Sequence, residues 1–386
     1  MEHERLSRLE GFLSRVLAGL NPAVAEALDR ALDGKELTVE EGEILLKAKG
    51  IEFQVLLLAA DFVRSLRVGE TVTFVVNRNI NFTNVCMVRC GFCAFSRPPN
   101  ASDAYLLKPE AVAERAAEAW KAGATEVCLQ GGIHPEIGLE YYVDVLRAVK
   151  ARVPAIHTHA YSPMEVYYAA EKAGVSVEEA LKALREAGLD SMPGTAAEIL
   201  DDEVRAVLCP RKLNVERWVE VVKTAHRLGI PTTSTMMYGH VDSARHRAQH
   251  LNLLRNLQKQ TGGFTEFVPL SFIHPQAPIY LKGLARPGAT GIEDLKLHAV
   301  ARLMLQGWID NIQASWVKLG PKLAQAALYA GANDLGGTLM EENISRAAGA
   351  TVGQHLPSEE LIRLIREAGR TPAQRTTTYQ IIKVYS

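Results

Sequence analysis

Three cysteines crowd one short stretch of this sequence. Cys86, Cys90 and Cys93 lie within CMVRCGFC, although the 386-residue chain has only five cysteines. A structural zinc site usually takes four nitrogen or sulfur ligands, often as two separated pairs. The other two cysteines, Cys128 and Cys209, are not placed as a matching pair. A cubane iron–sulfur cluster held by three thiolates leaves one iron open for an external ligand, so the spacing favours such a cluster.

Two other interpretations of the cysteines stay open. A nearby histidine such as His134 could complete a zinc site, or the thiols could be buried and incidental. The N-terminus has no uninterrupted apolar core of the signal-peptide kind, and no apolar run is long enough to span a bilayer. We therefore expect a cytoplasmic protein, in which thiols stay reduced unless a metal or a catalytic cycle uses them.

The composition and net charge limit which classes of binding partner we expect. A hydrophobic content of 47% suits a large core, and 23% charged residues describes an ordinary soluble surface. The net charge is only -1. Electrostatics therefore gives no reason to expect nucleic acid or an anionic membrane as a partner.

The elements that must position the cysteines follow a clear order. Residues 1–70 carry apolar residues at three- and four-residue spacing, which predicts an N-terminal helical region. Across residues 71–340, eight short strand-like segments alternate with amphipathic helical patterns, from TVTFVVN to GANDLGG. This order predicts an α/β fold, a (β/α)8 or near-complete TIM-type barrel. Residues 341–386 are expected to form a C-terminal helix and tail packed on the barrel, with Arg370 and Arg375 as surface charges.

Polar side chains gather where the predicted strands end, and barrel enzymes place their chemistry there. Strand alternation puts His157, His159 and Tyr161 on one face, so we expect these residues and Tyr238 to be catalytic. Glu198 follows the fourth strand and could reach a cofactor, or it could be an acid in the first turn of a helix. The further polar candidates at strand ends are Asn81, Thr83, Asn84, Gln130, Thr235, His240, Gln313, Ser315 and Asn333.

The cysteine stretch, including Phe92 before the last cysteine, resembles the signature of the radical S-adenosylmethionine (SAM) superfamily. The resemblance implies a radical SAM barrel in which Cys86, Cys90 and Cys93 hold a [4Fe-4S] cluster. S-adenosylmethionine would chelate the fourth iron, and one-electron reduction would release a 5′-deoxyadenosyl radical.

The resemblance also implies a cofactor contact set. In the superfamily the backbone at the aromatic position, here Phe92, approaches the adenine, and a Gly-Gly pair receives the methionine amino group. Gly131 and Gly132 match that pair, but Ile133 replaces the acid that often follows it, which makes Gln130 a candidate contact. Glu198 is the remaining candidate for the cofactor.

A longer series of motifs narrows the family. NRNINFTNVC, CLQGGIHPEIGLEYY, HTHAYSPMEV, TEFVPLSFIHPQAPIY and GANDLGGTLMEENISRAAGA, in this order, resemble the subunit 2 family of deazaflavin (FO) synthase. That family implies cleavage of L-tyrosine at Cα–Cβ and transfer of the 4-hydroxybenzyl group to C5 of 5-amino-6-(D-ribitylamino)uracil. It also implies a separate FO synthase subunit 1 and an electron donor. The alternatives are a radical SAM enzyme of the futalosine route to menaquinone and a zinc-stabilised, non-catalytic barrel.

Overall fold

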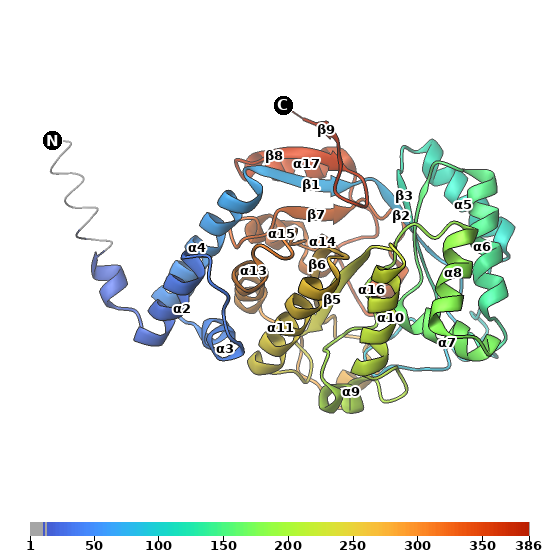
Figure 1. The fold of residues 1–386 in the computed structure, drawn as a ribbon, viewed down its shortest axis with the longest axis horizontal. Helices are drawn as coiled ribbons and strands as arrows, with labels where there is room; N and C mark the ends of the chain where they lie inside the picture. Colours follow the sequence, from blue (N-terminus) through green and yellow to red (C-terminus); the bar gives the residue numbers. More distant parts are fainter. Residues whose placement is uncertain (1–10, 12–13, 386) are drawn as a thin grey trace.

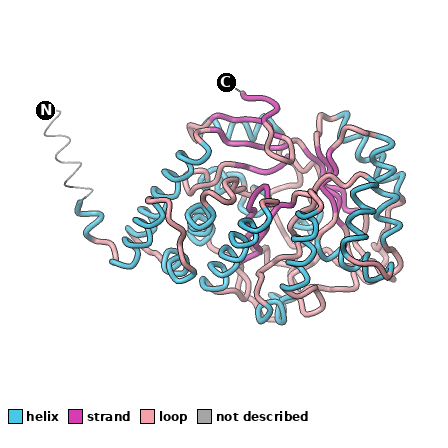
Figure 2. The backbone as a smooth tube through the Cα atoms, viewed as in Figure 1, coloured by secondary structure: helices cyan, strands magenta, loops and turns pink. Residues whose placement is uncertain are grey.

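A computed structural model describes residues 11 and 14–385 of the chain. Its centre is a set of parallel strands surrounded by helices (Figure 1, Figure 2). The parallel strands are β1 (Thr71–Val75), β2 (Asn77–Asn81), β3 (Glu126–Gln130), β4 (His157–Ala160), β5 (Thr232–Tyr238), β6 (Phe264–Ser271), β7 (Asp334–Gly337) and β8 (Thr371–Arg375). A ninth strand, β9 (Ile381–Val384), pairs antiparallel with β8 at the edge of the sheet.

The parallel pairings follow the chain order around a ring. β2 pairs with β3 and β3 with β4, while β5 pairs with β6. Single bridges at residues 191–192 join β4 to β5, and bridges at residues 312–313 join β6 to β7. β7 then pairs with β1, which runs on into β2 after one residue. The pairings thus return to the first strand.

All eight strand-like segments of the sequence take places in this ring, although two of them are reduced to bridges. In LDSMPG only Ser191 and Met192 pair, because the following Pro193 has no N–H with which to extend a ladder. In NIQASWV only Ile312 and Gln313 pair, since a helical turn begins at Trp316. The predicted alternation of strands and helices is therefore present.

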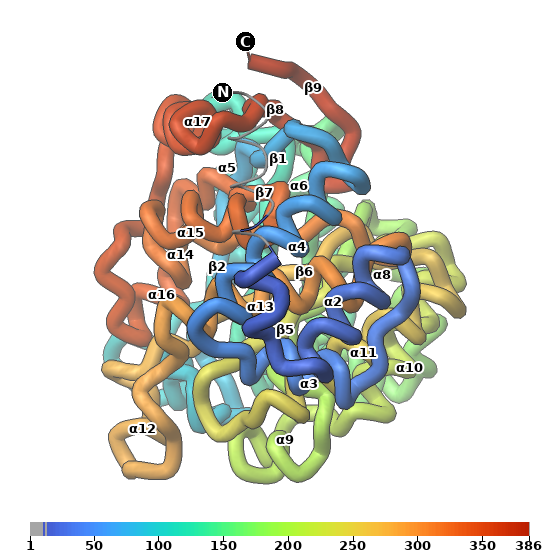
Figure 3. The backbone as a smooth tube through the Cα atoms, turned by 90° about the vertical axis from the view of Figure 1, so that its left-hand side faces the viewer, coloured from blue at the N-terminus to red at the C-terminus, as the bar shows by residue number. Residues whose placement is uncertain are grey.

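The N-terminal helices lie against the outer face of the ring's helices. They are α2 (Pro22–Leu32), α3 (Val39–Lys47) and α4 (Ile51–Val68), and Thr38 begins α3 through a capping box with Glu41. α3 packs on α11 (Ala244–Thr261) and α4 on α13 (Gly291–Leu305), as Figure 3 shows. Arg67 of α4 pairs with Asp310 at 2.7 Å. The N-terminal helical region thus packs against one side of the barrel.

The remaining helices mostly follow the strands in the expected βα order. Among the described residues, none of the helices has the length and apolar character needed to traverse a lipid bilayer. These helices are α5 (Pro109–Lys121), α6 (Leu139–Arg152), α7 (Pro163–Ala173), α8 (Val177–Ala187), α9 (Asp202–Leu208), α10 (Val215–Arg227), α12 (Pro278–Leu281), α14 (Trp316–Leu319), α15 (Pro321–Ala327), α16 (Asn343–Ala347) and α17 (Ser358–Glu367).

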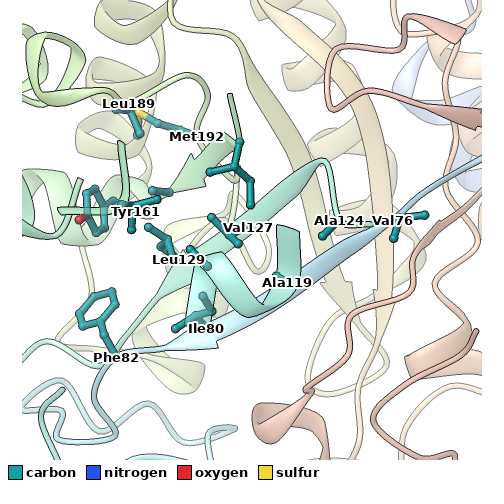
Figure 4. Close-up of a cluster of buried hydrophobic side chains, with 14 of the residues drawn as sticks. Val76, Ile80, Phe82, Ala119, Ala124, Val127, Leu129, Tyr161, Leu189 and Met192 are labelled. Carbon is teal, nitrogen blue, oxygen red and sulfur yellow. The ribbon is translucent and has the colours of Figure 1, made fainter. Parts of the chain in front are cut away.

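Apolar side chains fill the layer between strands and helices. Around β2 and β3 this layer contains Ile80, Val127 and Leu129, all fully buried (Figure 4). Alternation along β3 sends its other side chains toward the inside of the ring, where Gln130 borders a cavity. The outward apolar residues therefore anchor the strand and aim its polar residues inward.

The C-terminal segment closes the end of the ring where the strands begin. β8 pairs in parallel with β1, with Thr371 opposite Thr71. The expectation that Arg375 is a surface charge is wrong, since the residue is 2% exposed and its guanidinium binds Asp334 at 2.5 and 3.1 Å. The polar sequence around Arg375 hides this role because its partners come from distant strands.

Candidate active site

The three clustered cysteines line one end of a cavity at the carboxyl ends of the strands. Cys86, Cys90 and Cys93 border it from the loop after β2, and we call it the cysteine cavity. Backbone bonds fix this loop, since Gly91 donates to Leu208 O at 2.9 Å and accepts from Ile279 N–H at 2.7 Å. The three thiols are thus held together by a rigid frame.

The chemistry of these thiols fits a metal cluster. Burial raises the pKa of Cys90 and of Cys93, so both are neutral thiols unless a metal stabilises the thiolate. Within the described part of the chain, no three His, Cys, Asp or Glu side chains are grouped as ligands around one ion. His134 does not line the cysteine cavity, and its Nδ1 accepts the backbone N–H of Glu136 at 3.1 Å.

The glycine pair after β3 lets two loops touch. A Cβ on Gly132 would lie 2.2 Å from Val85 O and 2.8 Å from Cys86 Cβ, and a Cβ on Gly131 would lie 2.5 Å from the Phe82 ring. Only glycine allows this approach. The pair therefore brings the wall of the cavity against the first cysteine.

Glu165 is a site residue that sequence reasoning missed. It forms a capping box with Ser162 at the start of α7, and its Oε1 accepts the Gly131 N–H at 3.0 Å. Burial raises its pKa to about 7. Ile133, at the position where the superfamily often has an acid, packs instead in an apolar cluster. The sequence signal for Glu165 was the capping motif SPME, which by itself indicates only a helix start.

Glu198 and Lys212 form a second charged element of the cavity wall. Glu198 has a positive φ of 43° and precedes α9, so it is not an acid in the first turn of a helix. Lys212 donates to its carboxylate and lies 5.4 Å from the centre of the Phe92 ring. Although burial opposes it, the Lys212 ammonium holds the pKa of Glu198 below its usual range. Lys212 was not identified from sequence.

A second cavity shares part of its wall with the first. Gln130, Thr195, Leu270, Lys318 and Ile344 border both. We call the second space the lumen cavity; its other polar lining residues are Asn79, Gln313, Ser315, Glu342 and Ser345. Of the predicted strand-end polar residues, Gln130, Gln313 and Ser315 therefore reach one or both of these two cavities.

Most other polar candidates already have partners within the protein. Asn81, Thr83 and Asn84 donate side-chain hydrogen bonds to the carbonyls of Gln130, Tyr105 and Asp103. The side chains of Thr235, His240 and Asn333 likewise donate hydrogen bonds, to Gly194 O, to Met237 O and to the Asn311 side chain, respectively. These side chains support the framework of the ring.

The four predicted catalytic residues lie away from both cavities. His157 is the first and His159 the third residue of β4, and His157 Nε2 and His159 Nδ1 each lie 2.7 Å from Ser191 Oγ. Tyr161 does not share their face, because its φ of 61° turns the side chain into the apolar layer, where it donates to Tyr142 O (Figure 4). Tyr238 is fully buried and donates to Asp294 at 2.6 Å.

Comparisons with known proteins agree with this site. The radical SAM superfamily matches residues 80–254, and the CofH/MqnC C-terminal region matches residues 261–386. The chain belongs to the radical SAM superfamily. It is 56% identical to 5-amino-6-(D-ribitylamino)uracil–L-tyrosine 4-hydroxyphenyl transferase of Methanothermobacter thermautotrophicus, over 92% of this chain and 97% of that one. The same transferase of Methanopyrus kandleri is 59% identical, over 94% and 98%. Within the superfamily, the chain therefore belongs to the family of these transferases.

Further comparisons concern a longer relative and two solved structures of similar fold. FO synthase of Mycobacterium tuberculosis is 55% identical over 88% of this chain, which spans only 40% of that longer protein. Among solved structures, methylornithine synthase matches 90% of this chain and 97% of its own with a TM-score of 0.70 at 20% identity. The FeFe-hydrogenase maturase HydG from Carboxydothermus hydrogenoformans matches 97% and 85% with a TM-score of 0.73 at 16% identity. These likenesses confirm the predicted barrel-type α/β fold.

The close packing at Gly132 gives a first test of the radical SAM site. We expect Gly132→Ala to displace the cysteine loop, because the new methyl would overlap Val85 O. Iron bound after anaerobic reconstitution should fall at least about tenfold, since a displacement of the order of 1 Å disrupts a preorganised ligand set. Gly138→Ala is the control, as its Cβ would meet only the flexible Lys172 side chain at 3.5 Å. Equal iron contents in the two variants would contradict this account.

His250 gives a second, pH-dependent test. It is fully buried in α11, and its Nδ1 accepts the N–H of Leu200, two residues after Glu198. Burial lowers its pKa to about 3, against about 6.5 in an unfolded chain. Because the folded pKa is depressed, the stabilisation is complete above pH 6.5 and is lost as pH falls toward 3. We expect the destabilisation caused by His250→Gln, measured by urea unfolding, to shrink by about 1.4 kcal/mol per pH unit below 6.5. A pH-independent difference between the two proteins would contradict the burial of a neutral imidazole.

Proposed function

We propose that this protein cleaves L-tyrosine between Cα and Cβ and transfers the 4-hydroxybenzyl group to C5 of 5-amino-6-(D-ribitylamino)uracil. The identity of 53–59% with transferases of that name, over nearly their full length, carries this proposal. The site supports it, because a cysteine cavity opens beside a lumen cavity that offers both apolar and polar walls. Neither the futalosine-type alternative nor the zinc-stabilised barrel is favoured by a specific observation.

In this proposal the residues of the cysteine cavity hold the cluster and S-adenosylmethionine. Cys86, Cys90 and Cys93 hold the [4Fe-4S] cluster. Once bound, the cluster and S-adenosylmethionine supply the 5′-deoxyadenosyl radical that attacks tyrosine. The remaining walls of the cysteine cavity bind and orient S-adenosylmethionine, through Phe92, Gln130, Gly131, Gly132, Glu165, Glu198 and Lys212.

The placement of charge on this wall suits the cofactor. The Glu198–Lys212 pair offers one group of each sign, and the Phe92 ring beside it offers an aromatic surface for the adenine. The carboxylate of Glu165, held over the glycine pair, takes the position that Ile133 leaves without an acid. Apolar residues such as Met237, Leu270 and Phe272 cover the rest and exclude water from a radical.

Two partners belong to the proposal. The FO synthases of mycobacteria are longer chains of which this protein matches 40%, so we propose that a separate subunit 1 supplies the rest of their chemistry. A one-electron donor must also reach the cluster, because the radical forms only after reduction.

The decisive experiment uses the reconstituted, dithionite-reduced protein under anaerobic conditions. It is incubated with S-adenosylmethionine, L-tyrosine and 5-amino-6-(D-ribitylamino)uracil, and the products are read by mass spectrometry. We expect 5′-deoxyadenosine together with a uracil adduct that carries a hydroxybenzyl group. Deoxyadenosine without the adduct would refute the acceptor, and neither product from a cluster-loaded protein would refute the radical chemistry.

A further inference from the structure

Two side chains of opposite charge, one buried and one half-buried, line the lumen cavity without a direct ion pair between them. Glu342 is 6% exposed, and Lys318 is half-buried beside it. Among the described residues neither Glu342 nor Lys318 forms a direct ion pair, and the two groups attract each other only at longer range. A buried charge without a counter-ion is costly. The cavity therefore calls for a ligand that brings charges of its own.

The neighbours of Glu342 orient its carboxylate but leave its charge uncompensated. Its Oε1 accepts the backbone N–H of Ser345 at 2.6 Å, and its Oε2 accepts from Asn79 Nδ2 at 3.1 Å. Both donors are neutral, and each carboxylate oxygen can accept a further hydrogen bond. The carboxylate is thus fixed in place with capacity for a cationic donor.

Lys318 is also bonded to a neutral partner and can form further hydrogen bonds, but its charge is positive. Its ammonium donates to Ser345 Oγ at 2.6 Å, one bond of the three that it can make. Burial lowers its pKa, and the facing Glu342 opposes that shift. Since Lys318 and Glu342 both bond to Ser345, one residue separates the two charges. Both charges thus lie beside Ser345 in the same cavity, where a single zwitterionic ligand such as an amino acid can meet both of them.

We propose that Lys318 binds the α-carboxylate of the tyrosine substrate and Glu342 its α-ammonium. This inference rests on the proposed function, which supplies tyrosine as the substrate. The neutral diaminouracil with its ribityl chain gains little from a pair of opposite charges, whereas a desolvated zwitterion needs both. Apolar walls of the same cavity, formed by Val268, Leu270, Leu335 and Ile344, suit the hydroxyphenyl ring.

The site also lies where the reaction needs it. Lys318 borders the cysteine cavity as well as the lumen cavity, together with Gln130 and Leu270. Tyrosine anchored there would hold its Cα–Cβ bond near the wall that the two cavities share. Lys318 and Glu342 are thus positioning residues that set both the affinity for tyrosine and its orientation toward the radical.

The test is equilibrium dialysis of the reconstituted protein with S-adenosylmethionine and no reductant, so that nothing turns over. The ligands are L-tyrosine, tyramine, which lacks the carboxylate, and 3-(4-hydroxyphenyl)propanoate, which lacks the amine. We expect the unaltered protein to bind tyrosine about 10- to 100-fold more tightly than either analogue, because each analogue leaves one buried charge unpaired. Equal binding of all three ligands would overturn the proposal without any variant.

Matched variants assign each charge. Lys318→Met should weaken tyrosine about 10- to 100-fold and leave tyramine unchanged, whereas Glu342→Gln should weaken tyrosine and leave the propanoate unchanged. Lys322→Met, at an exposed lysine of α15, is the control and should change neither. Iron–sulfur absorption confirms that each variant has kept its cluster and fold. Weaker binding of the diaminouracil with unchanged binding of tyrosine would overturn the assignment.

The outcome is separable from that of the proposed function. Selective tyrosine binding without adduct formation would refute the acceptor and leave the zwitterion site standing. Adduct formation in a protein that binds tyramine as tightly as tyrosine would keep the function and refute Lys318 as the carboxylate contact.

Discussion

Replacing Cys90 with alanine is expected to remove the iron–sulfur cluster and with it all cleavage of S-adenosylmethionine. A [4Fe-4S] cluster that takes three protein thiolates cannot be held by two, so iron after reconstitution should fall from roughly four per chain to near zero. The barrel should survive, because Cys90 sits in a small apolar cluster and alanine removes only one sulfur atom from it. Iron analysis, visible absorption and 5′-deoxyadenosine assays measure the loss.

Cys209→Ala is the matched control for this prediction. Cys209 is buried in the same apolar cluster as Cys90 but does not border the cysteine cavity. The Cys209→Ala protein should keep its iron and its cleavage of S-adenosylmethionine. This result would show that loss of a cluster ligand, and not loss of packing, causes the effect of Cys90→Ala. A Cys90→Ala protein that still cleaves S-adenosylmethionine would falsify the assignment of the cluster.

The sequence predicted the cysteine wall well because its parts are local. Three thiols within eight residues share one loop in any fold, and the glycine pair follows a strand that is easily recognised. The barrel was predictable for a similar reason, since each βα unit has its own periodic pattern. Even the two segments that pair only through single bridges had been predicted as strands.

The two histidines that the sequence predicted to be catalytic, His157 and His159, show what alternation leaves open. Period-two spacing fixes which face of a strand a side chain takes, but not how far along the strand it lies. β4 begins only at His157 and ends before Tyr161, so both histidines lie within the strand and do not follow its end. The backbone turn at Tyr161 then removes it from their face.

Apart from Glu198, the charged residues of the two cavities were missed because they come together only in three dimensions. Glu165 and Lys212 lie 47 positions apart in the sequence, and Lys318 and Glu342 lie on either side of β7. Each one alone has the sequence signal of a surface charge or a helix start. Their function depends on burial, which a single sequence does not specify for a charged side chain.

Arg375 is the largest error of this kind, and it carries the last prediction. It lies inside the starting end of the ring, bound to Asp334 and 3.6 Å from Glu266, whose pKa burial raises to about 7. We expect Arg375→Met to lower the free energy of unfolding by about 3–5 kcal/mol, because it leaves buried carboxylates without a cation. For a domain of this size that loss corresponds to a fall in melting temperature of roughly 10 °C in thermal unfolding.

The control and the pH dependence make this prediction specific. Arg363→Met removes a guanidinium that pairs with Glu360 and Glu367 on the exposed face of α17, and it should lower the free energy of unfolding far less than Arg375→Met does, because water screens the exposed pairs. The cost of Arg375→Met should shrink as pH falls below 7, since the stranded Glu266 carboxylate then takes up a proton in the folded state. Asp334→Asn added to Arg375→Met should recover part of the loss, because it removes one stranded charge. If Arg375→Met melts like the unaltered protein at pH 8, the C-terminal segment does not hold the ring closed through this ion pair.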